Sequence, residues 1–282
     1  MKRKLIAAAV AVMSLSAHAG IVNVGYGDFS DTSGFQINGD AATHTPNSDN
    51  VLRLTDGLSE SGSAFLTDPI SLLNEASFSS FFSFQISNPS GSGDEDGIGA
   101  DGLVFALQTI SNTAGSFGGG LGYSGIDRSL GVEFDTYNNG AGDGSNGNHV
   151  GVNLNGSVSS VLLHNEPVRF NDGDVWNVWV DYDGESNMLG VSYSMDSVRP
   201  DTFTLSYEVD LVNIFGSDDV FVGFSSGTGG GGGTHDILSF GFNNDFRPIE
   251  DTNVTASVSE PSAVFLMGMG LLALGGFGRR KS

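Results

Sequence analysis

The sequence predicts an all-β protein, an antiparallel β-sandwich built as a single domain. Short runs of alternating apolar and polar residues follow one another along the chain, with the period of half-buried strands. Turn-forming residues separate these runs, and the 282 residues include 42 glycines and 20 phenylalanines. No run of helical period exceeds about two turns. Strand-rich sandwiches often exceed 200 residues in one domain, so the length does not require a second.

Alternation within the runs assigns side chains to faces of the predicted strands. The opposite faces of two of these strands carry Phe81 and Trp179. The Gly-rich stretches at 115–120 and 227–233 are predicted to be loops. The apolar residues expected to share a face within each strand are Phe82, Phe84, Ile86, Trp176, Tyr182, Leu189, Val191, Tyr193, Val220, Val222 and Phe224.

Composition limits the partners and the chemistry. The chain has 11 Lys and Arg residues against 33 Asp and Glu residues, a net charge of −22. Such a surface repels phosphate backbones, so we expect no nucleic-acid partner, whereas metal cations and neutral sugars remain possible ligands. The chain has no cysteine. Disulfides, thiolate metal sites and a cysteine nucleophile are therefore excluded.

The first residues have the pattern of a secretory signal peptide. Basic residues at 2–4 precede an apolar run at 5–15, and Ala-His-Ala at 17–19 is a small-x-small cleavage site. The apolar run is too short for an ordinary membrane span. We expect residues 1–19 to direct export and the mature protein to begin at Gly20.

The last residues combine three parts in a fixed order. Ser-Glu-Pro at 259–261 precedes an apolar stretch at 263–277 and a basic cluster at 279–281. This order resembles the bacterial PEP-CTERM sorting signal, although Ser259 stands where the first proline is usual. The resemblance implies an exosortase-type partner, export to the cell surface or extracellular matrix, and membrane tethering until the tail is cleaved. A plain C-terminal membrane anchor is the alternative. The expected divisions are a sandwich at 20–249, a linker at 250–258 and a sorting signal at 259–282.

Glu133 and Asp135 belong to the segment with the most informative chemistry. In a strand they share one face and lie roughly 7 Å apart. The following loop returns Asn139, Asp143 and His149. Carboxylate and amide oxygens suit Ca²⁺, whereas a set with one imidazole suits Mn²⁺ or a similar transition ion. The alternative is that Glu133 and Asp135 face solvent and that His149 is an ordinary loop histidine.

Several further segments, taken in chain order, carry a family resemblance. They are 38–41, 65–72, 78–86, Gly-Ala-Asp-Gly-Leu-Val-Phe-Ala at 99–106, Gly-Gly-Gly-Leu-Gly-Tyr at 118–123, 132–149, 222–229 and 234–239. Together they resemble the L-type (legume-type) lectins over roughly residues 30–245. The resemblance implies a legume-lectin-like jelly roll and an exported, non-enzymatic carbohydrate-binding protein.

The resemblance also implies two metal sites. The transition-metal ligands would be Glu133, Asp135, Asp143 and His149. Calcium would be bound by Asp135, the backbone carbonyl of Tyr137, Asn139 and Asp143. The gap between Asn139 and Asp143 is one residue shorter than in some plant lectins, a departure from the family pattern that concerns Asp143.

A sugar site next to the metals is the third implication. The Ala100–Asp101 bond would be cis, and Asp101 would accept hydrogen bonds from two sugar hydroxyls. The Asn139 amide would donate to the sugar, as would a backbone N–H of Gly119 or Gly120. The ring of Tyr137 would face the apolar side of the pyranose. The fourth loop, at 229–233, would either offer a backbone N–H of Gly230 or Gly231 or be a flexible spacer. It has no side chain that would distinguish one sugar from another, so the sequence does not specify the sugar.

Two other functions remain open. One is a structural matrix or adhesion protein whose lectin fold is inert. The other is a sandwich glycoside hydrolase, because Glu133-Phe-Asp135 is similar to the Glu-x-Asp-x-x-Glu motif of laminarinase-like enzymes. The third acid is missing, since position 138 is Asn, and metal ligation explains the segment better.

The remaining polar clusters give weaker signals. Asp94, Glu95 and Asp96 stand in a Gly- and Ser-rich stretch and are expected to be solvated rather than to bind calcium. His235 precedes a predicted strand beside Asp236 and is expected to serve loop structure. No Ser-His-Asp order, P-loop or dinucleotide fingerprint is present.

Overall fold

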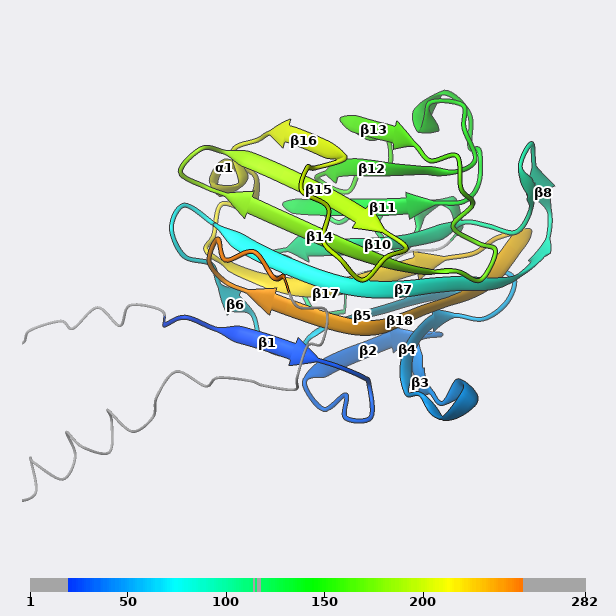
Figure 1. Ribbon diagram of the computed structural model, residues 1–282, viewed down its shortest axis with the longest axis horizontal. Coiled ribbons are helices and arrows are strands. Elements are labelled where there is room, and N and C mark those ends of the chain that lie inside the picture. The colour runs from blue at the N-terminus through cyan, green and yellow to red at the C-terminus, as the bar shows by residue number, and fades with distance from the viewer. Residues whose placement is uncertain (1–19, 114, 116–117, 251–282) are drawn as a thin grey trace, which may run out of the picture.

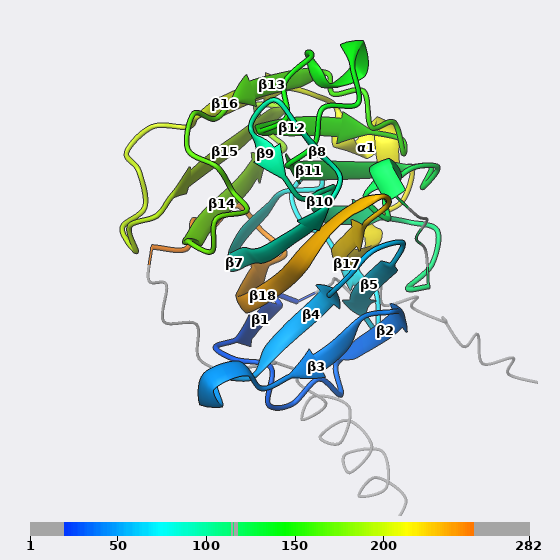
Figure 2. The ribbon, with the colours of Figure 1, turned by 90° about the vertical axis from the view of Figure 1, so that its right-hand side faces the viewer.

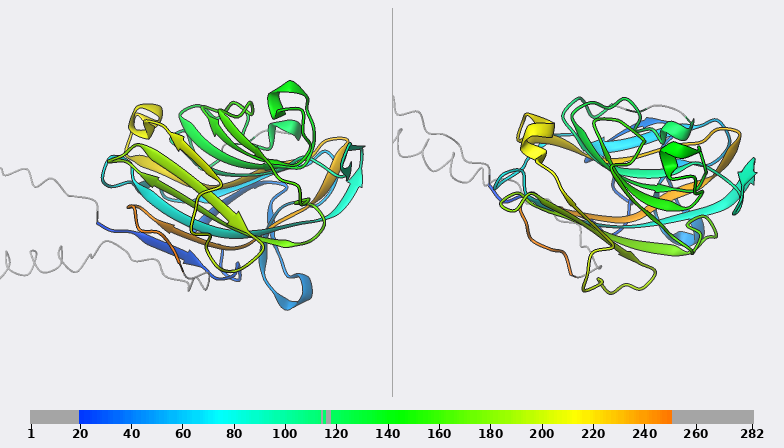
Figure 3. Two further views of the ribbon diagram at one scale, coloured as in Figure 1. Left: turned by 45° about the horizontal axis from the view of Figure 1, so that its top comes forward. Right: turned by 90° about the horizontal axis from the view of Figure 1, so that it is seen from above.

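A computed structural model describes residues 20–113, 115 and 118–250. Two large antiparallel sheets lie face to face as a sandwich, which confirms the predicted fold class (Figures 1 and 3). The predicted signal peptide and sorting signal, and the linker beyond Glu250, lie outside the described residues. No helix within the described ranges is long and apolar enough to cross a bilayer.

The first sheet has eight strands, all paired antiparallel. In spatial order these are β16 (Leu205–Glu208), β15 (Met188–Ser194), β14 (Val175–Asp183), β7 (Phe78–Gly91), β18 (Gly231–Asn243), β4 (Val51–Thr55) and β3 (Ala42–His44), with β1 (Asn23–Tyr26) also pairing with β18.

The second sheet also has eight strands in antiparallel pairing. Its order is β13 (Leu162–Asn165), β12 (His149–Leu154), β11 (Ser129–Asp135), β10 (Gly102–Gln108), β17 (Asp219–Gly227), β5 (Ser61–Leu66) and β2 (Phe35–Gly39), with β6 (Ile70–Ser71) also pairing with β17. A separate hairpin of β8 (Gly93–Asp94) and β9 (Gly97–Ile98) projects at one end (Figure 1).

Helices are few and short within the described residues. The one α-helix in these ranges, α1 (Leu211–Phe215), begins at Asp210, whose carboxylate accepts a hydrogen bond from the Asn213 N–H at 2.9 Å. Three 3-10 turns complete the set: η1 (Pro46–Ser48), η2 (Gly118–Gly120) and η3 (Ala141–Asp143). This agrees with the lack of long helical periodicity in the sequence.

The core lies between the sheets and is rich in phenylalanine. Phe82 of the first sheet meets Phe105 and Phe224 of the second, with ring centroids 5.4 and 5.2 Å apart. All the apolar residues predicted to share strand faces are buried in this core. Phe81 and Trp179 pack together on the outer side of their sheet, with centroids 5.3 Å apart. The predicted face assignments are therefore confirmed.

The core also fixes the direction of the acidic residues on β11. Phe134 is completely buried against the rings of Phe84 and Phe170. Because side chains alternate along a strand, Glu133 and Asp135 must point to the opposite face. A shift of one residue would place two carboxylates in the hydrophobic core, so the packing of Phe134 determines the register of the candidate site.

The predicted loop at 227–233 is wrong at both ends. Gly227 ends β17 and Gly231 begins β18, so the connection is only a tight turn. The glycines permit close approach of backbones rather than flexibility. An added Cβ on Gly231 would lie 2.8 Å from the Cβ of Ala100, and one on Gly232 would lie 2.1 Å from the carbonyl oxygen of Gly57. The other Gly-rich stretch lies in the connection between β10 and β11, as predicted for a loop, and its residues 118–120 form the short turn η2.

β18 connects the two ends of the sandwich. It starts with Gly231 paired to Gly91, at the end of β7, and finishes with Asn243 paired to Ser79, near the start of β7. The hairpin β8–β9 follows β7 directly. The C-terminal end of β18 therefore lies at the end of the sandwich opposite this hairpin.

Candidate functional site

Four segments meet at the end of the sandwich that carries the β8–β9 hairpin. They are the residues before β10, the turn η2, the loop between β11 and β12, and the β17–β18 turn. Figure 2 looks onto this end and shows β8, β9 and the ends of β10, β11 and β17 gathered there. These segments carry the predicted sugar-binding residues, and the adjoining ends of β11 and β12 carry the predicted ligands Glu133, Asp135 and His149.

Asp101 is held by backbone bonds on both sides. The Ala100–Asp101 peptide is cis, as the family resemblance implied. The Asp101 N–H donates to the Gly227 carbonyl at 3.4 Å, and its carbonyl accepts from the Thr136 N–H at 2.8 Å. Only 5% of the residue is exposed. Asp101 is thus tied to the β17–β18 turn and to the start of the β11–β12 loop.

Two glycines bring backbone close to the predicted sugar-binding side chains. An added Cβ on Gly119 would lie 3.1 Å from Oδ1 of Asn139, and one on Gly229 would lie 3.7 Å from Oδ2 of Asp101. Gly120 follows Gly119 in the same turn. Gly230 is exposed, and its carbonyl accepts from the Ser92 N–H at 2.9 Å. Gly119 therefore lies beside Asn139, and Gly229 lies beside Asp101. Gly227, which accepts from the Asp101 N–H, also adjoins Gly118, because an added Cβ on Gly227 would lie 2.5 Å from the Gly118 carbonyl oxygen.

Glu133 and His149 form the other half of the site. Both are buried, with exposures of 1% and 0%, and Nε2 of His149 lies 3.5 Å from Oε1 of Glu133. Asp135 is directly opposite His149 in the pairing of β11 with β12. Asp135 is 3% exposed, and its Oδ1 accepts from the Tyr137 N–H at 2.7 Å. The alternative that the two carboxylates face solvent is therefore wrong.

The hydrogen bonding of His149 orients its ring. Nδ1 lies 3.2 Å from the carbonyl oxygen of Asn146. A carbonyl only accepts, so Nδ1 donates in this contact, and Nε2 is the ring nitrogen that faces Oε1 of Glu133. That buried Nε2 has no hydrogen-bond partner among the described residues. Metal-binding histidines commonly donate their second ring N–H to a carbonyl in this way. The geometry of His149 fits a metal ligand.

The remaining predicted ligands lie on the β11–β12 loop. The Nδ2 atom of Asn139 is 3.4 Å from the carbonyl oxygen of Tyr137, so these two groups share one side of the loop. Asp143 ends η3, but its side chain lies outside the described residues. Among the residues whose side chains are described, no three His, Cys, Asp or Glu groups converge as a metal cluster. The donor types still suit the predicted ions, oxygens for Ca²⁺ and one imidazole for a transition ion.

Sequence reasoning missed two neighbours of Glu133. Asn153 donates through Nδ2 to Oε2 of Glu133, and Ser160 donates through Oγ to Oε1. A signal for Asn153 was present, because His149, Gly151 and Asn153 share one face of β12 by strand alternation. Ser160 had none, since it comes from the connection to β13. These bonds hold the Glu133 carboxylate in one orientation.

Glu95 is exposed, as predicted, and Asp94 is half-buried, but both acids also accept hydrogen bonds from the β11–β12 loop. Oδ2 of Asp94 accepts from the Asn138 N–H at 2.6 Å. Glu95 accepts from Nδ2 of Asn138 at 3.0 and 3.1 Å and from the Gly147 N–H at 3.1 Å. The sequence signal was misleading because Gly and Ser neighbours suggested a loose loop. The stretch instead folds back as the β8–β9 hairpin onto the β11–β12 loop.

Asp96, the third acid of the hairpin, is half-buried, with 23% of its side chain exposed. Burial, together with the hydrogen bond and negative charge of Asp94, raises the pKa of Asp96 to about 6, although Arg169 lowers it. Nε of Arg169 lies 3.4 Å from Oδ2 of Asp96. The hairpin therefore holds one carboxyl whose pKa is raised chiefly by burial.

His235 lies inside β18 and is fully buried, so the prediction that it serves loop structure is wrong. Its Nδ1 is 2.7 Å from Oγ1 of Thr55, which is 3.1 Å from Oγ of Ser226, and Ser226 donates to the Gly102 carbonyl at 2.7 Å. Because that carbonyl only accepts, donation must run from His235 through Thr55 and Ser226. The chain of bonds crosses between the sheets and ends beside Asp101.

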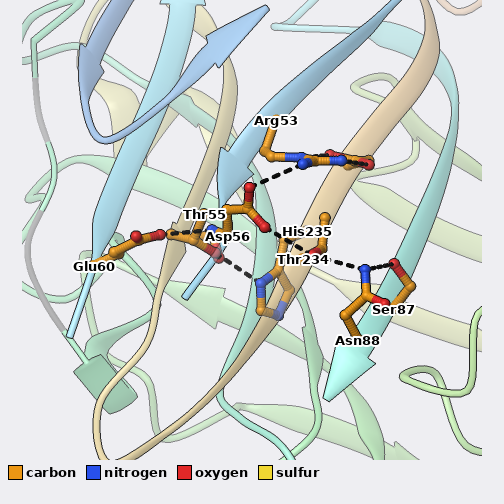
Figure 4. Close-up of polar contacts among 10 residues, drawn as sticks. Arg53, Thr55, Asp56, Glu60, Ser87, Asn88, Thr234 and His235 are labelled. Carbon is orange, nitrogen blue, oxygen red and sulfur yellow. Dashed lines mark hydrogen bonds and ion pairs between the residues drawn. The ribbon is translucent and has the colours of Figure 1, made fainter. Parts of the chain in front are cut away.

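Figure 4 shows the surroundings of His235. Arg53 donates from Nε and Nη2 to the two carboxylate oxygens of Asp236, at 2.8 and 2.9 Å. Asp56 accepts from Nη1 of Arg53 at 2.9 Å and from Thr234 at 3.0 Å. The β4–β5 turn that carries Asp56 also bonds to the β17–β18 turn, through the Thr228 N–H and the Glu60 carbonyl at 2.9 Å. This polar cluster is thus linked to the β17–β18 turn of the candidate site.

Burial of His235 predicts an acid-sensitive stability. Burial lowers its pKa from 6.5 to about 4, so the unfolded state binds a proton at a higher pH than the folded state. Stability from this group is complete above pH 6.5 and is lost as pH falls toward 4, by roughly 3 kcal/mol. Urea unfolding at pH 7, 5.5 and 4 measures this loss. His235→Gln should lose about 3 kcal/mol less over the same range, whereas equal losses in both proteins would contradict the prediction.

Comparison with protein families gives two matches. Residues 22–258 match the legume lectin domain family. Residues 257–281 match the PEP-CTERM protein-sorting motif.

Curated relatives include plant lectins and receptor kinases. The L-type lectin-domain containing receptor kinase VIII.1 of Arabidopsis thaliana is 38% identical over 176 residues, covering 60% of this chain and 24% of the kinase. Bark agglutinin I polypeptide B of Robinia pseudoacacia is 36% identical over 181 residues, covering 60% of this chain and 59% of the agglutinin. The chain thus spans less than two thirds of either relative.

Solved structures of lectins share the fold over nearly their whole length. Peanut lectin with a nine-residue peptide superposes with a TM-score of 0.65 at 30% identity, covering 80% of this chain and 97% of the lectin. Winged bean acidic lectin, complexed with methyl-α-D-galactose, gives a TM-score of 0.67 at 27% identity, covering 86% and 100%.

Proposed function

The chain belongs to the legume lectin domain family, and we propose that it is an exported lectin that binds glycans with the help of Ca²⁺ and a transition-metal ion. The observation that supports this function most is that Asp101 and the Gly119–Asn139 pair lie at one end of the sandwich, on either side of Gly227. Three different segments supply these residues. Their meeting beside the Glu133–His149 pair is the arrangement that a metal-dependent sugar site requires.

The proposed metal ligands divide into two sets. Glu133, Asp135, Asp143 and His149 would hold Mn²⁺ or another transition ion, and Asp135, the Tyr137 carbonyl, Asn139 and Asp143 would hold Ca²⁺. When bound, the ions neutralise the buried carboxylates and fix the β11–β12 loop. The unpartnered Nε2 of His149 and the buried Glu133 carboxylate beside it support this assignment. Asn153 and Ser160 orient Glu133, as outer partners of metal ligands commonly do.

The sugar would be held by groups from several loops. The Asp101 carboxylate would accept hydrogen bonds from two hydroxyls, and charge-assisted bonds of this kind are the stronger ones. Asn139 and a backbone N–H of Gly119 or Gly120 would donate, and the Tyr137 ring would cover the apolar side of the pyranose. Gly230 would contribute a backbone N–H from the short turn. Water competes for every hydroxyl, so single sugars should bind weakly.

Enclosure of Glu133 argues against the hydrolase alternative and supports a non-enzymatic role. A glycosidase needs two carboxyl groups on either side of the bond that it cleaves. Glu133 is 1% exposed and is surrounded by Asn153, Ser160 and His149, so its carboxylate faces protein groups rather than an open cleft. A structural protein with an inert site is the alternative, and metal-dependent glycan binding would exclude it.

The C-terminal motif supports export. A PEP-CTERM protein-sorting motif occupies residues 257–281, and an exosortase-type enzyme would recognise it. β18 finishes at the end of the sandwich opposite the candidate site. A protein tethered through its C-terminus to the cell surface or matrix would thus keep the sugar site at its far end.

Glycan binding with and without metal tests the proposed function. Protein loaded with Ca²⁺ and Mn²⁺ is applied to a glycan array, and a matched sample is treated with EDTA. Galactose and methyl-α-galactose are the first probes, because solved neighbours of 27% identity are complexed with these sugars. Binding that EDTA abolishes and Ca²⁺ restores is expected. Absence of any metal-dependent signal at high protein density would favour the structural role.

A further inference from the structure

The β8–β9 hairpin adjoins three of the four segments of the proposed site, namely the residues before β10, the β17–β18 turn and the β11–β12 loop. At its base, the Ser92 N–H donates to the Gly230 carbonyl of the β17–β18 turn at 2.9 Å. The Gly99 N–H closes the hairpin by donating to the Ser92 carbonyl at 3.0 Å. The chain then passes directly into Ala100 and Asp101. The base of the hairpin is therefore continuous with the sugar-binding loop.

The tip of the hairpin holds the β11–β12 loop. The two acids, Asp94 and Glu95, accept four hydrogen-bond contacts from Asn138 and Gly147. The approach is close, because an added Cβ on Gly147 would lie 2.2 Å from Oδ2 of Asp94. Asn138 stands between the proposed ligands Tyr137 and Asn139, and Gly147 lies shortly before His149. The contacts thus bracket the metal-binding loop near both ends.

The other side of the hairpin is anchored to the segment before β14. Nη2 of Arg169 donates to the Ile98 carbonyl at 3.1 Å. The same segment accepts from Nδ2 of Asn148, through the carbonyls of Glu166 and Val168 at 2.7 and 2.8 Å. Asn148 directly precedes His149. The hairpin and the end of the metal-binding loop are therefore fixed to one common support.

We propose that Asp94 and Glu95 are positioning residues that hold the metal-binding loop, residues 136–148, against the Asp101 loop before any ion binds. Neither acid belongs to the proposed ligand sets. By keeping the loop close to its binding conformation, they reduce the ordering cost that Ca²⁺ would otherwise meet, and so raise the affinity for the ion. The first part of this proposal, that the acids hold the loop, concerns the protein without metal. The second part, that they raise the affinity for Ca²⁺, rests on the proposed function.

Hydrogen exchange of the metal-free protein tests the first part. The Asn138 and Gly147 amides donate directly to the two acids, so their exchange reports these bonds. In EDTA, the double variant Asp94→Ala/Glu95→Ala should exchange the amides of residues 136–148 at least about tenfold faster than wild type. Exchange in β14 should not change, which would show that the variant is folded. Unchanged exchange at 136–148 would overturn the proposal.

Calcium affinity tests the second part. Calorimetric titration of Ca²⁺ into the metal-free proteins should give a dissociation constant about 10-fold or more higher in the double variant, as for other groups that orient metal ligands. Faster exchange with unchanged Ca²⁺ affinity would overturn the link to metal binding. If wild type binds no Ca²⁺, the proposed function fails and the second part fails with it, whereas the exchange result still decides the first.

Two matched variants separate position from charge. Glu95→Gln removes the charge but keeps an oxygen that accepts hydrogen bonds, so its exchange and Ca²⁺ affinity should stay within about threefold of wild type. Glu185→Ala removes an exposed acid from the β14–β15 turn, at the far end of the sandwich, and should change neither. An equal loss of affinity in Glu185→Ala, or a full loss in Glu95→Gln, would show that the acids act only through long-range attraction.

Discussion

Replacing Asp101 with alanine is expected to abolish glycan binding while the protein remains folded. The proposed bonds from two sugar hydroxyls to this carboxylate are charge-assisted and are each worth about 1.5–3 kcal/mol. Losing both would weaken binding by more than about 100-fold. For a site that binds single sugars weakly, such a loss takes the affinity beyond measurement. Surface plasmon resonance with immobilised glycan, comparing the soluble variant with wild type, measures the loss of binding.

The structure of the Asp101→Ala protein should be nearly unaffected. The contacts of Asp101 with Gly227 and Thr136 are made by its backbone and survive the substitution. The melting temperature in EDTA and the affinity for Ca²⁺ should therefore stay close to those of wild type. Asp127→Ala, which removes an exposed acid elsewhere on the chain, is the matched control and should bind normally. Normal glycan binding by Asp101→Ala would show that the sugar site has been placed wrongly.

Replacing Asp135 with asparagine is expected to remove both metal and sugar binding. Asp135 is the proposed ligand of both ions, and changes to the outer partners of metal ligands already cost about 10–100-fold in affinity. Loss of a direct, shared ligand should exceed that range. Calorimetric titration of Ca²⁺ and Mn²⁺ into the metal-free variant, followed by glycan binding in excess metal, measures both losses.

Asparagine is the informative choice at Asp135. Its side-chain oxygen can still accept from the Tyr137 N–H, a bond of 2.7 Å in the wild type. The metal-free variant should therefore melt within a few degrees of metal-free wild type, so the losses cannot be attributed to unfolding. Glycan binding that survives in Asp135→Asn without bound metal would show that the ions are not needed for the sugar site.

Strand patterning predicted the sandwich and the orientation of its side chains. Alternation placed Phe82, Phe84 and Ile86 in the core and set Glu133 on the face opposite Phe134, and the structure confirms each of these. Such predictions succeed because a strand has a period of two and one buried face decides its register. The resemblance to L-type lectins also placed the cis Ala100–Asp101 bond correctly.

Contacts between distant segments could not be predicted from the sequence. The hydrogen bonds from Ser160 to Glu133 and from Asn138 to Asp94 join residues far apart in the chain, and no local pattern records them. The predicted loop at two glycines was wrong for a similar reason. Gly231 and Gly232 suggested a loop, because the sequence does not show that neighbouring backbones pass close enough to exclude a Cβ. His235 looked like a loop residue for the same reason, since its partner Thr55 belongs to a distant strand.

Calcium titration of metal-free wild-type protein tests most directly whether the acids of β11 and the loop beside them bind divalent ions that shape a sugar site. Saturable binding of one calcium ion per chain is expected, with a rise in melting temperature of roughly 5–10 °C when the ion is present at about 100 times its dissociation constant. No heat of binding and no change in melting temperature would contradict the account.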